Sequence, residues 1–255
     1  MNEFDKIKKI FDFLTQHLED LEEDSSSGYG FNMPDYDLYA RDYLEFAENQ
    51  LIEGTPEALI NCISNLKRAV DCQTDTFLYT LSLFDTFRRR NLKFEKKLEL
   101  ISSIGVFNST SLAKLNKIRN KMEHEYALPQ IDEIDLYFDL VSAFVSNLES
   151  VITVLQWDEI NLYARDNEDG FDTNFRLRLD RSLEPKMIAT WSLPHSNEDI
   201  IEITFNEYKG FAFYLRCLYM LNIKKAFASN SYVKRNIEKA FNKLQIDLEE
   251  NSGRR

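Results

Sequence analysis

Apolar residues recur at steps of three and four through the first 157 positions, a period that predicts amphipathic helices. The first apolar stripe predicts a helix over residues 3–23 and consists of Phe4, Ile7, Phe11, Leu14 and Leu18. Three serines and two glycines follow within residues 25–30, and Pro34 comes shortly after them. This composition is typical of a linker, so the chain beyond it is expected to pack separately.

After this linker the pattern predicts helices over residues 35–54, 55–88, 94–104, 109–128 and 131–157. Thr55 and Pro56 are suited to the N-cap and first position of the second of these helices, and Gly105 is suited to end the third. The last helix has too many apolar residues for a surface helix. It is expected to form the centre of a bundle or a subunit interface.

The period changes after Trp157, where β-forming residues appear in three short runs, residues 175–179, 186–193 and 200–205. Turn-like connections between the runs predict a three-strand antiparallel meander, followed by helices over 206–227 and 231–248. The sequence therefore predicts a mainly α protein, an antiparallel helical bundle with a C-terminal α+β extension. Its expected parts are residues 1–34, an N-terminal helix and linker, 35–157, the bundle, and 158–255, the extension.

Composition narrows the function classes. The formal net charge is -12, which argues against a protein that coats nucleic acid non-specifically, although a local basic cleft remains compatible with it. Three cysteines, with no pair at metal-ligand spacing, favour buried thiols in a reducing compartment. The sequence shows no signal-peptide pattern and no apolar run of transmembrane length, so a cytoplasmic protein without membrane contact is expected. It shows no metal or cofactor motif either, and none is expected.

One short stretch combines groups that could act on a phosphate: Arg119, Asn120, His124 and Tyr126. Histidine is the usual proton carrier near neutral pH, and a guanidinium binds phosphate well. On a straight helix, however, Arg119 and His124 are separated by about 140° around the axis, so they would not converge on one atom. Convergence requires a distorted helix, a long arginine arm or a second subunit. The same spacing also fits ordinary ion pairs of Arg119 with Glu123 and of Lys121 with Glu125 at i,i+4.

The pattern Arg-Asn-x-x-x-His-x-Tyr near the end of a helix resembles the motif of the HEPN family, in which four to six residues separate the arginine from the histidine. The segment 65–73 also resembles the long helix of that family, and the resemblance covers residues 35–157. It implies a five-helix bundle that dimerises with the two motifs facing each other. In many members this arrangement is a metal-independent ribonuclease.

The resemblance also implies roles for the motif residues. Arg119 would bind the scissile phosphate, and His124 would act as general acid or base. Asn120 would position His124 or the phosphate. Tyr126 matches the tyrosine that a nucleotidyltransferase antitoxin adenylylates in similar toxins. The implied function is a homodimeric endoribonuclease, a toxin or phage-defence effector, that leaves 2′,3′-cyclic phosphate ends. Its partners would be RNA and an antitoxin or defence-system protein. The alternative is a non-catalytic HEPN module that holds RNA or a nucleotide, or mediates protein assembly.

Two other groups of residues are candidates for a function. Arg176, Arg178 and Arg181, with Phe175 and Trp191 nearby, could form a basic aromatic sheet face that touches single-stranded RNA. Alternating charge on the solvent side of an amphipathic sheet explains the same pattern and is preferred. The remaining histidines, His17 and His195, have no ligand-like neighbours. His17 is expected to be a surface or a satisfied structural histidine, and His195 is expected in a turn.

Overall fold

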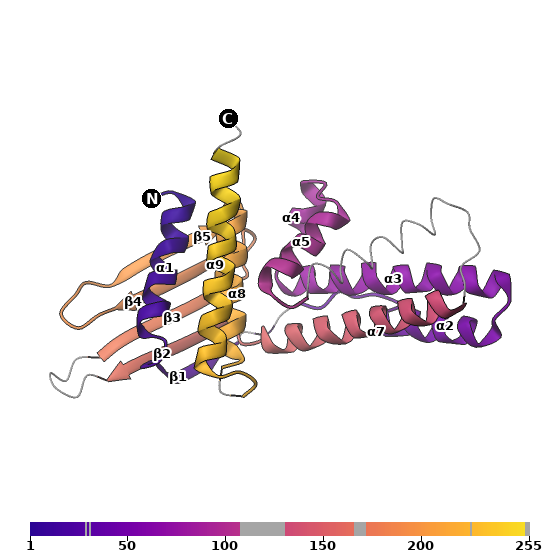
Figure 1. Cartoon of the computed structure of the whole chain (residues 1–255), viewed down its shortest axis with the longest axis horizontal. Helices are drawn as coiled ribbons and strands as arrows, with labels where there is room; N and C mark the ends of the chain where they lie inside the picture. Colours follow the sequence, from indigo (N-terminus) through magenta and orange to yellow (C-terminus); the bar gives the residue numbers. More distant parts are fainter. Residues whose placement is uncertain (29, 31, 108–130, 166–171, 225, 253–255) are drawn as a thin grey trace. The chain divides into compact units, whose positions relative to one another are not determined.

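The structure is a computed structural model that describes residues 1–255 except 29, 31, 108–130, 166–171, 225 and 253–255. Its helices are α1 (Glu3–His17), α2 (Ala40–Glu53), α3 (Pro56–Thr80), α4 (Phe84–Arg89), α5 (Phe94–Ile104), α7 (Ile131–Val154), α8 (Tyr208–Asn222) and α9 (Asn230–Ser252) (Figure 1). Its strands are β1 (Glu22–Ser27), β2 (Glu159–Arg165), β3 (Asp172–Asp180), β4 (Lys186–Ser192) and β5 (Asp199–Thr204). The chain divides into an α+β unit, Met1–Gly30 with Val154–Arg255, and a helical unit, Phe31–Thr153.

The α+β unit is built on one antiparallel sheet with the strand order β1-β2-β3-β4-β5. Side chains alternate between its two faces, as strand geometry requires. One row across β2 to β5 shows the apolar face: Ile160, Leu177, Ala189 and Ile201 lie opposite one another and are all buried. Most alternate residues on the other face are polar, and most are at least partly exposed, so helices cover only one face of the sheet.

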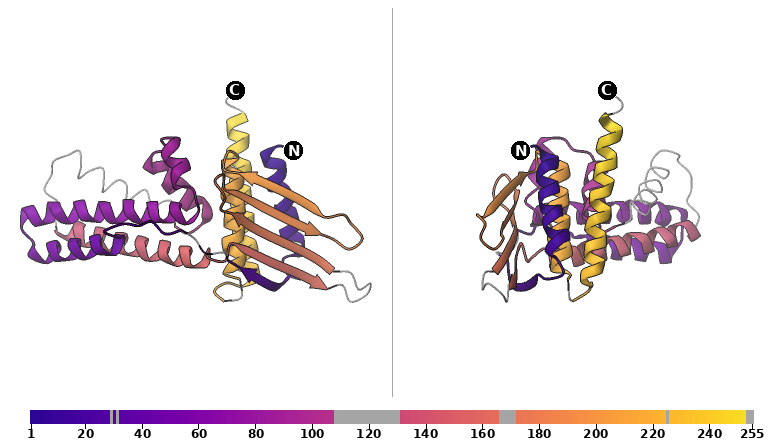
Figure 2. Two further views of the ribbon diagram at one scale, coloured as in Figure 1. Left: turned by 180° about the vertical axis from the view of Figure 1, so that it is seen from behind. Right: turned by 60° about the vertical axis from the view of Figure 1, so that its left-hand side comes forward.

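Helices cover that apolar face (Figure 2). Helix α8 packs across β2, β3, β4 and β5, and α1 and α9 pack against α8. Ten residues of α8 are buried, including Phe211, Tyr214 and Leu218, because the sheet and α9 pack against α8 and α1 lies beside it. The central element of this unit is therefore apolar on nearly all sides, as expected for a buried helix.

Hydrogen bonds from α1 to the region of α8 hold the two helices together. The hydroxyl of Tyr214 donates to the carbonyl of Lys6 at 2.8 Å, and the backbone N–H of Gly210 donates to Glu3 Oε1 at 2.7 Å. Beyond the end of α8, the buried ammonium of Lys224 donates to the carbonyls of Leu21 and Leu18, at 2.5 and 3.4 Å. These contacts make the first residues of the chain part of the α+β unit.

The helical unit contains a hairpin of α2 and α3. Gly54 ends α2 in the left-handed conformation, with φ 67°, and the Thr55 hydroxyl accepts a hydrogen bond from the Ala58 N–H to begin α3. Helix α7 joins this hairpin through a bidentate ion pair, in which the Arg41 guanidinium donates to Glu149 at 3.0 and 2.5 Å. The caps at Thr55 and at Gly105, which ends α5 with φ 87°, confirm the boundaries expected from the sequence.

Helix α7 supplies the core of the helical unit. Six of its apolar side chains have no exposed surface: Ile134, Tyr137, Val141, Phe144, Val145 and Leu148. Their burial is complete within a single chain, so this stripe occupies the centre of the helical unit. The two roles left open for this helix are thereby reduced to one, because the stripe is not available to a second subunit.

The expectation of a mainly α fold with a three-strand meander is wrong. The described chain is a mixed α+β protein with eight helices and a five-stranded antiparallel sheet. The missed strands are β1 and β2. Strand β1 reads Glu-Glu-Asp-Ser-Ser-Ser and carries no apolar alternation, because it is an edge strand that buries little. The sequence pattern predicts a helix for the first of its residues and a linker for the rest, but pairing with β2 makes them extended.

The other errors concern helix ends. The helix expected to reach residue 88 stops at Thr80, where Ser82 takes a positive φ of 55° and the short helix α4 follows. The first helix ends at His17 instead of residue 23. In both places apolar residues continue the helical period into a turn, so the period alone did not show the end.

Candidate functional site

The four motif residues, Arg119, Asn120, His124 and Tyr126, all fall within 108–130 and so lie outside the described residues. In sequence the segment is flanked by α5 and α7, both of which belong to the helical unit.

The described residues before and after this segment contact different parts of the helical unit. The Phe107 ring packs on Phe144 with centroids 5.4 Å apart, near the middle of α7. Toward the start of α7, the charge of Asp135 acts on the buried thiol of Cys62 near the start of α3. Burial, with a smaller contribution from this charge, raises the pKa of Cys62 to about 11. The described residue before the motif thus packs on α7, and the start of α7 lies near Cys62 of α3.

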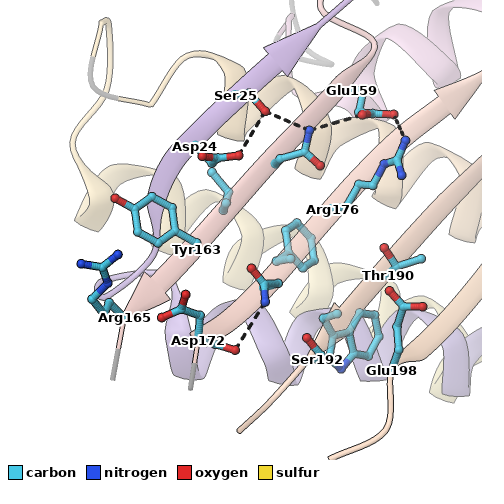
Figure 3. A pocket seen from close by; sticks show the side chains of 15 residues that line it. Asp24, Ser25, Glu159, Tyr163, Arg165, Asp172, Arg176, Thr190, Ser192 and Glu198 are labelled. Carbon is cyan, nitrogen blue, oxygen red and sulfur yellow. Dashed lines mark hydrogen bonds and ion pairs between the residues drawn. The ribbon is translucent and has the colours of Figure 1, made fainter. Parts of the chain in front are cut away.

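A polar depression of about 690 Å³ lies over the sheet of the α+β unit (Figure 3). Polar side chains from neighbouring strands line it, among them Asn161, Tyr163, Asn174, Arg176 and Thr190. The register brings Asn161, Arg176 and Thr190 into one row. The depression follows from the strand alternation, since the opposite side chains fill the core.

Glu159 and Arg176 form the main ion pair of this surface, with Nη2 and Oε2 2.6 Å apart. Only 8% of the Glu159 side chain is exposed, and Arg178 lies 3.9 Å from the same carboxylate. Burial alone would raise the pKa of Glu159, but hydrogen bonds from Arg176 and Asn161 and the charges of both arginines hold it below its usual value. One carboxylate thereby neutralises much of the charge of two arginines.

The basic aromatic face considered for RNA is not formed. Phe175 and Trp191 are buried on the opposite side of the sheet from Arg176, where they pack on Phe13 at centroid distances of 5.2 and 5.3 Å. Arg181 is ion-paired with the buried Asp158 and donates to the Leu155 carbonyl at 2.6 Å. The preferred explanation, an amphipathic sheet with charges on its solvent side, accounts for the arrangement.

The charge of the depression also opposes a polyanion. Among its lining residues the acids are Asp24, Glu159, Asp172 and Glu198, whereas the bases are Arg165 and Arg176. Four carboxylates against two guanidiniums leave a net charge of about -2, which repels phosphates. The depression therefore does not extend the predicted RNA site.

A second hollow, which we call the amide groove, lies on the helical unit and has a volume of about 480 Å³. It is lined from α2 by Phe46, Asn49 and Gln50, and from α3 by Asn61, Ser64, Asn65 and Arg68. Four of these seven side chains are amides, and none is a carboxylate. Within the described residues, the four amides and Arg68 make no side-chain hydrogen bond or ion pair, so their donors and acceptors face solvent.

The sequence reasoning missed the amide groove. Asn61, Asn65 and Arg68 follow one another at helical steps of four and three, and on the preceding helix Asn49 and Gln50 lie three and four positions after Phe46. This spacing could have placed each set on one face. It could not show that the two faces adjoin, because that depends on how α2 packs against α3.

The remaining candidates are structural. The His17 ring packs on Phe13 at 4.9 Å, and His195 takes a positive φ of 59° in the turn between β4 and β5. Cys62 and Cys217 are buried and Cys72 is half-buried, and all three thiols are free. In the part of the chain that the structure describes, no three His, Cys, Asp or Glu residues are grouped to hold a metal ion. No helix there is both long and apolar enough to cross a membrane.

Comparisons with protein-family models, with curated proteins and with solved structures found no match for this chain. Its function is therefore argued from its own residues.

Proposed function

We propose that this chain is a metal-independent endoribonuclease that acts as a homodimer through Arg119 and His124. The observation that carries the proposal is the sequence motif Arg-Asn-x-x-x-His-x-Tyr over residues 119–126. It places a phosphate-binding cation, a polar side chain and a proton carrier within six consecutive residues. The helical unit supports the proposal because it gives the motif a packed scaffold on both sides in sequence.

The reaction requires only groups that the motif supplies. His124 takes the proton of the ribose 2′-hydroxyl while the 2′ oxygen attacks phosphorus, and the bond from phosphorus to the 5′ oxygen breaks. The same proton then passes to the leaving 5′ oxygen. Arg119 stabilises the charge that develops on the phosphate oxygens. The products are a 2′,3′-cyclic phosphate and a 5′-hydroxyl, so atoms and charge balance without an added cation.

The homodimer that we propose would bring the two side chains of the motif to one phosphate. A straight helix directs Arg119 and His124 about 140° apart, so one copy presents only one of them to a given phosphate. A second copy with its motif facing the first can supply the other, which gives a cleft shared between subunits. In that cleft Asn120 orients His124 or the phosphate, and Tyr126 lies at the edge.

Labelled RNA incubated with the pure protein in excess EDTA tests the chemistry. We expect cleavage to 2′,3′-cyclic phosphate ends, and a fall of roughly 100-fold or more in rate for both Arg119→Ala and His124→Ala. Arg88→Ala is the matched control, since Arg88 is an exposed arginine outside the motif. Equal cleavage by wild type and both motif variants would contradict the mechanism. Binding of RNA with no cleavage at all would favour the non-catalytic alternative.

Mixing the two inactive variants tests the shared cleft. A heterodimer of Arg119→Ala and His124→Ala retains one complete site if each site takes its arginine and histidine from different copies. We then expect an equimolar, freely exchanging mixture to recover roughly a quarter of wild-type activity. No recovery would contradict a site built from one residue of each copy.

The biological role that we propose is that of a toxin or phage-defence effector held in check by a partner protein. Expression should arrest growth, and His124→Ala should relieve the arrest.

Adenylylation of Tyr126 would put a bulky negative charge beside the RNA cleft and block it. An AMP-sized mass increase on Tyr126 in the presence of a nucleotidyltransferase encoded next to it would support this control, and its loss in Tyr126→Phe would assign the site.

A further inference from the structure

The amide groove presents hydrogen-bonding groups that have no partner among the residues the structure describes. Asn61 and Asn65 are one helical turn apart on α3, and Asn49 and Gln50 face them from α2. Each carboxamide offers two N–H donors and a carbonyl acceptor side by side. This pairing matches the adjacent donor and acceptor positions on the edge of an unpaired nucleobase.

An exposed aromatic ring stands at the same groove. Phe46 has 40% of its surface exposed, and the Tyr43 ring meets it edge-on with centroids 6.3 Å apart. The contact with Tyr43 restricts the Phe46 ring while leaving it open to solvent. Single-stranded nucleic acids stack their bases on such rings, because every base has a π-face.

Charge favours the same kind of ligand. Among the described residues that line the amide groove, Arg68 is the only one with a charged side chain. In a chain with a net charge of -12, a lining with one guanidinium and no carboxylate is a local exception. The sheet depression shows the contrast, since carboxylates outnumber bases there. A phosphate is therefore tolerated at the groove and opposed at the depression.

An extended peptide could also use the amides, since a carboxamide pairs with a peptide group. A peptide would not account for the Arg68 guanidinium beside the exposed Phe46 ring. Together these two groups suit a phosphate and its base. We propose that the amide groove binds an unpaired segment of RNA, with a base stacked on Phe46, its edge bonded to the amides and a neighbouring phosphate on Arg68. The inference deepens the proposed function, on which it rests for RNA as the substrate, by assigning a docking subsite outside the motif.

The test measures binding in a protein that cannot cleave. A fluorescein-labelled, unstructured RNA of about ten nucleotides is titrated with full-length His124→Ala, followed by anisotropy at two salt concentrations. In that background Phe46→Ala should weaken binding roughly 5- to 100-fold through lost stacking. Asn65→Ala should weaken it roughly 3- to 10-fold through a lost hydrogen bond to the base edge. Arg68→Ala should reduce the dependence of log affinity on log salt by about one unit.

Two matched controls remove a phenylalanine and an arginine that do not line the amide groove. Phe227 is 82% exposed on the α+β unit, so Phe227→Ala should leave RNA affinity unchanged. Arg88→Ala should leave both affinity and salt dependence unchanged. Circular dichroism of each variant confirms folding before titration, and all groove positions tested are surface positions.

The outcomes are separable from those of the nuclease assay. Equal RNA affinity in the groove variants and in the parent would overturn the subsite, whether or not the wild type cleaves. A parent that binds a neutral extended peptide in the groove but not the RNA would overturn it as well. Normal groove binding together with no cleavage by the wild type would support the subsite and contradict only the catalytic proposal.

Discussion

Cys217 lies in the middle of α8 and has no exposed surface. Burial raises the pKa of its thiol from 9.0 to about 12, because a thiolate there would lose its hydration. Burial also raises the pKa of the Cys62 thiol in the helical unit. Neither thiol is an accessible nucleophile in the folded protein.

The raised pKa of Cys217 predicts a fall in stability at high pH. Above about pH 9 the unfolded chain releases the thiol proton and the folded chain keeps it, so deprotonation favours unfolding. The free energy of unfolding should then drop by about 1.4 kcal/mol per pH unit on account of this thiol. Urea titrations between pH 8 and pH 10.5 measure the slope. Cys217→Ala should be less stable at pH 8 but should decline less steeply, and parallel slopes would contradict the assignment.

At the scale of elements, the end of α1 depends on a residue far away in sequence. Lys224, which follows α8, is 6% exposed and donates to the carbonyls of Leu18 and Leu21 just after α1. Carbonyls at a helix end have no intrahelical donor, so a buried end needs one from elsewhere. The ammonium of Lys224 supplies it and ties α1 to the end of α8.

Lys224→Met should lower the free energy of unfolding by about 1–3 kcal/mol, because buried carbonyls lose their donor. Lys234→Met is the control. Lys234 is partly exposed and lies 3.8 Å from the exposed Glu19, so its loss should cost less than about 1 kcal/mol. Thermal or urea unfolding of both variants makes the comparison. A larger loss for Lys234→Met than for Lys224→Met would show that the capping argument is wrong.

Element prediction succeeded where local signals were complete. Thr55, Pro56 and Gly105 mark helix ends by their own backbone and side-chain chemistry, and the structure places caps at these positions. It failed at β1, whose extended form comes from pairing with β2, more than a hundred residues later. No local pattern carries that information, since an exposed edge strand needs no apolar alternation.

At the scale of the whole molecule, the helical unit is inserted between two paired strands. Ser27 of β1 lies opposite Glu159 of β2, so the chain leaves the sheet and returns at neighbouring positions. Gly28 approaches the Gln156 carbonyl so closely that a Cβ built on it would be 2.0 Å from that oxygen. Insertions with adjacent ends of this kind leave the parent unit its own core.

Replacing residues 31–153 by a short Gly/Ser linker should therefore leave a folded α+β unit. We expect a single cooperative thermal transition and slow hydrogen exchange in β2 to β4 and α8, whose core residues all come from this unit. The control is the same shortened chain with Gly28→Ala, which should be less stable because the added methyl meets the Gln156 backbone. A shortened chain without a cooperative transition would contradict the independence of the unit.

By itself, the sequence determined the helical periods, the caps, three of the five strands and the Arg119–His124 motif, because each depends on residues close together in the chain. Only the tertiary structure decided that the chain is mixed α+β, that Phe175 and Trp191 pack on Phe13 of α1, and that the amides of α2 and α3 share one groove. These features depend on strand pairing and helix packing between distant segments. Their free energy comes from surfaces buried together, which no local stretch of the sequence contains.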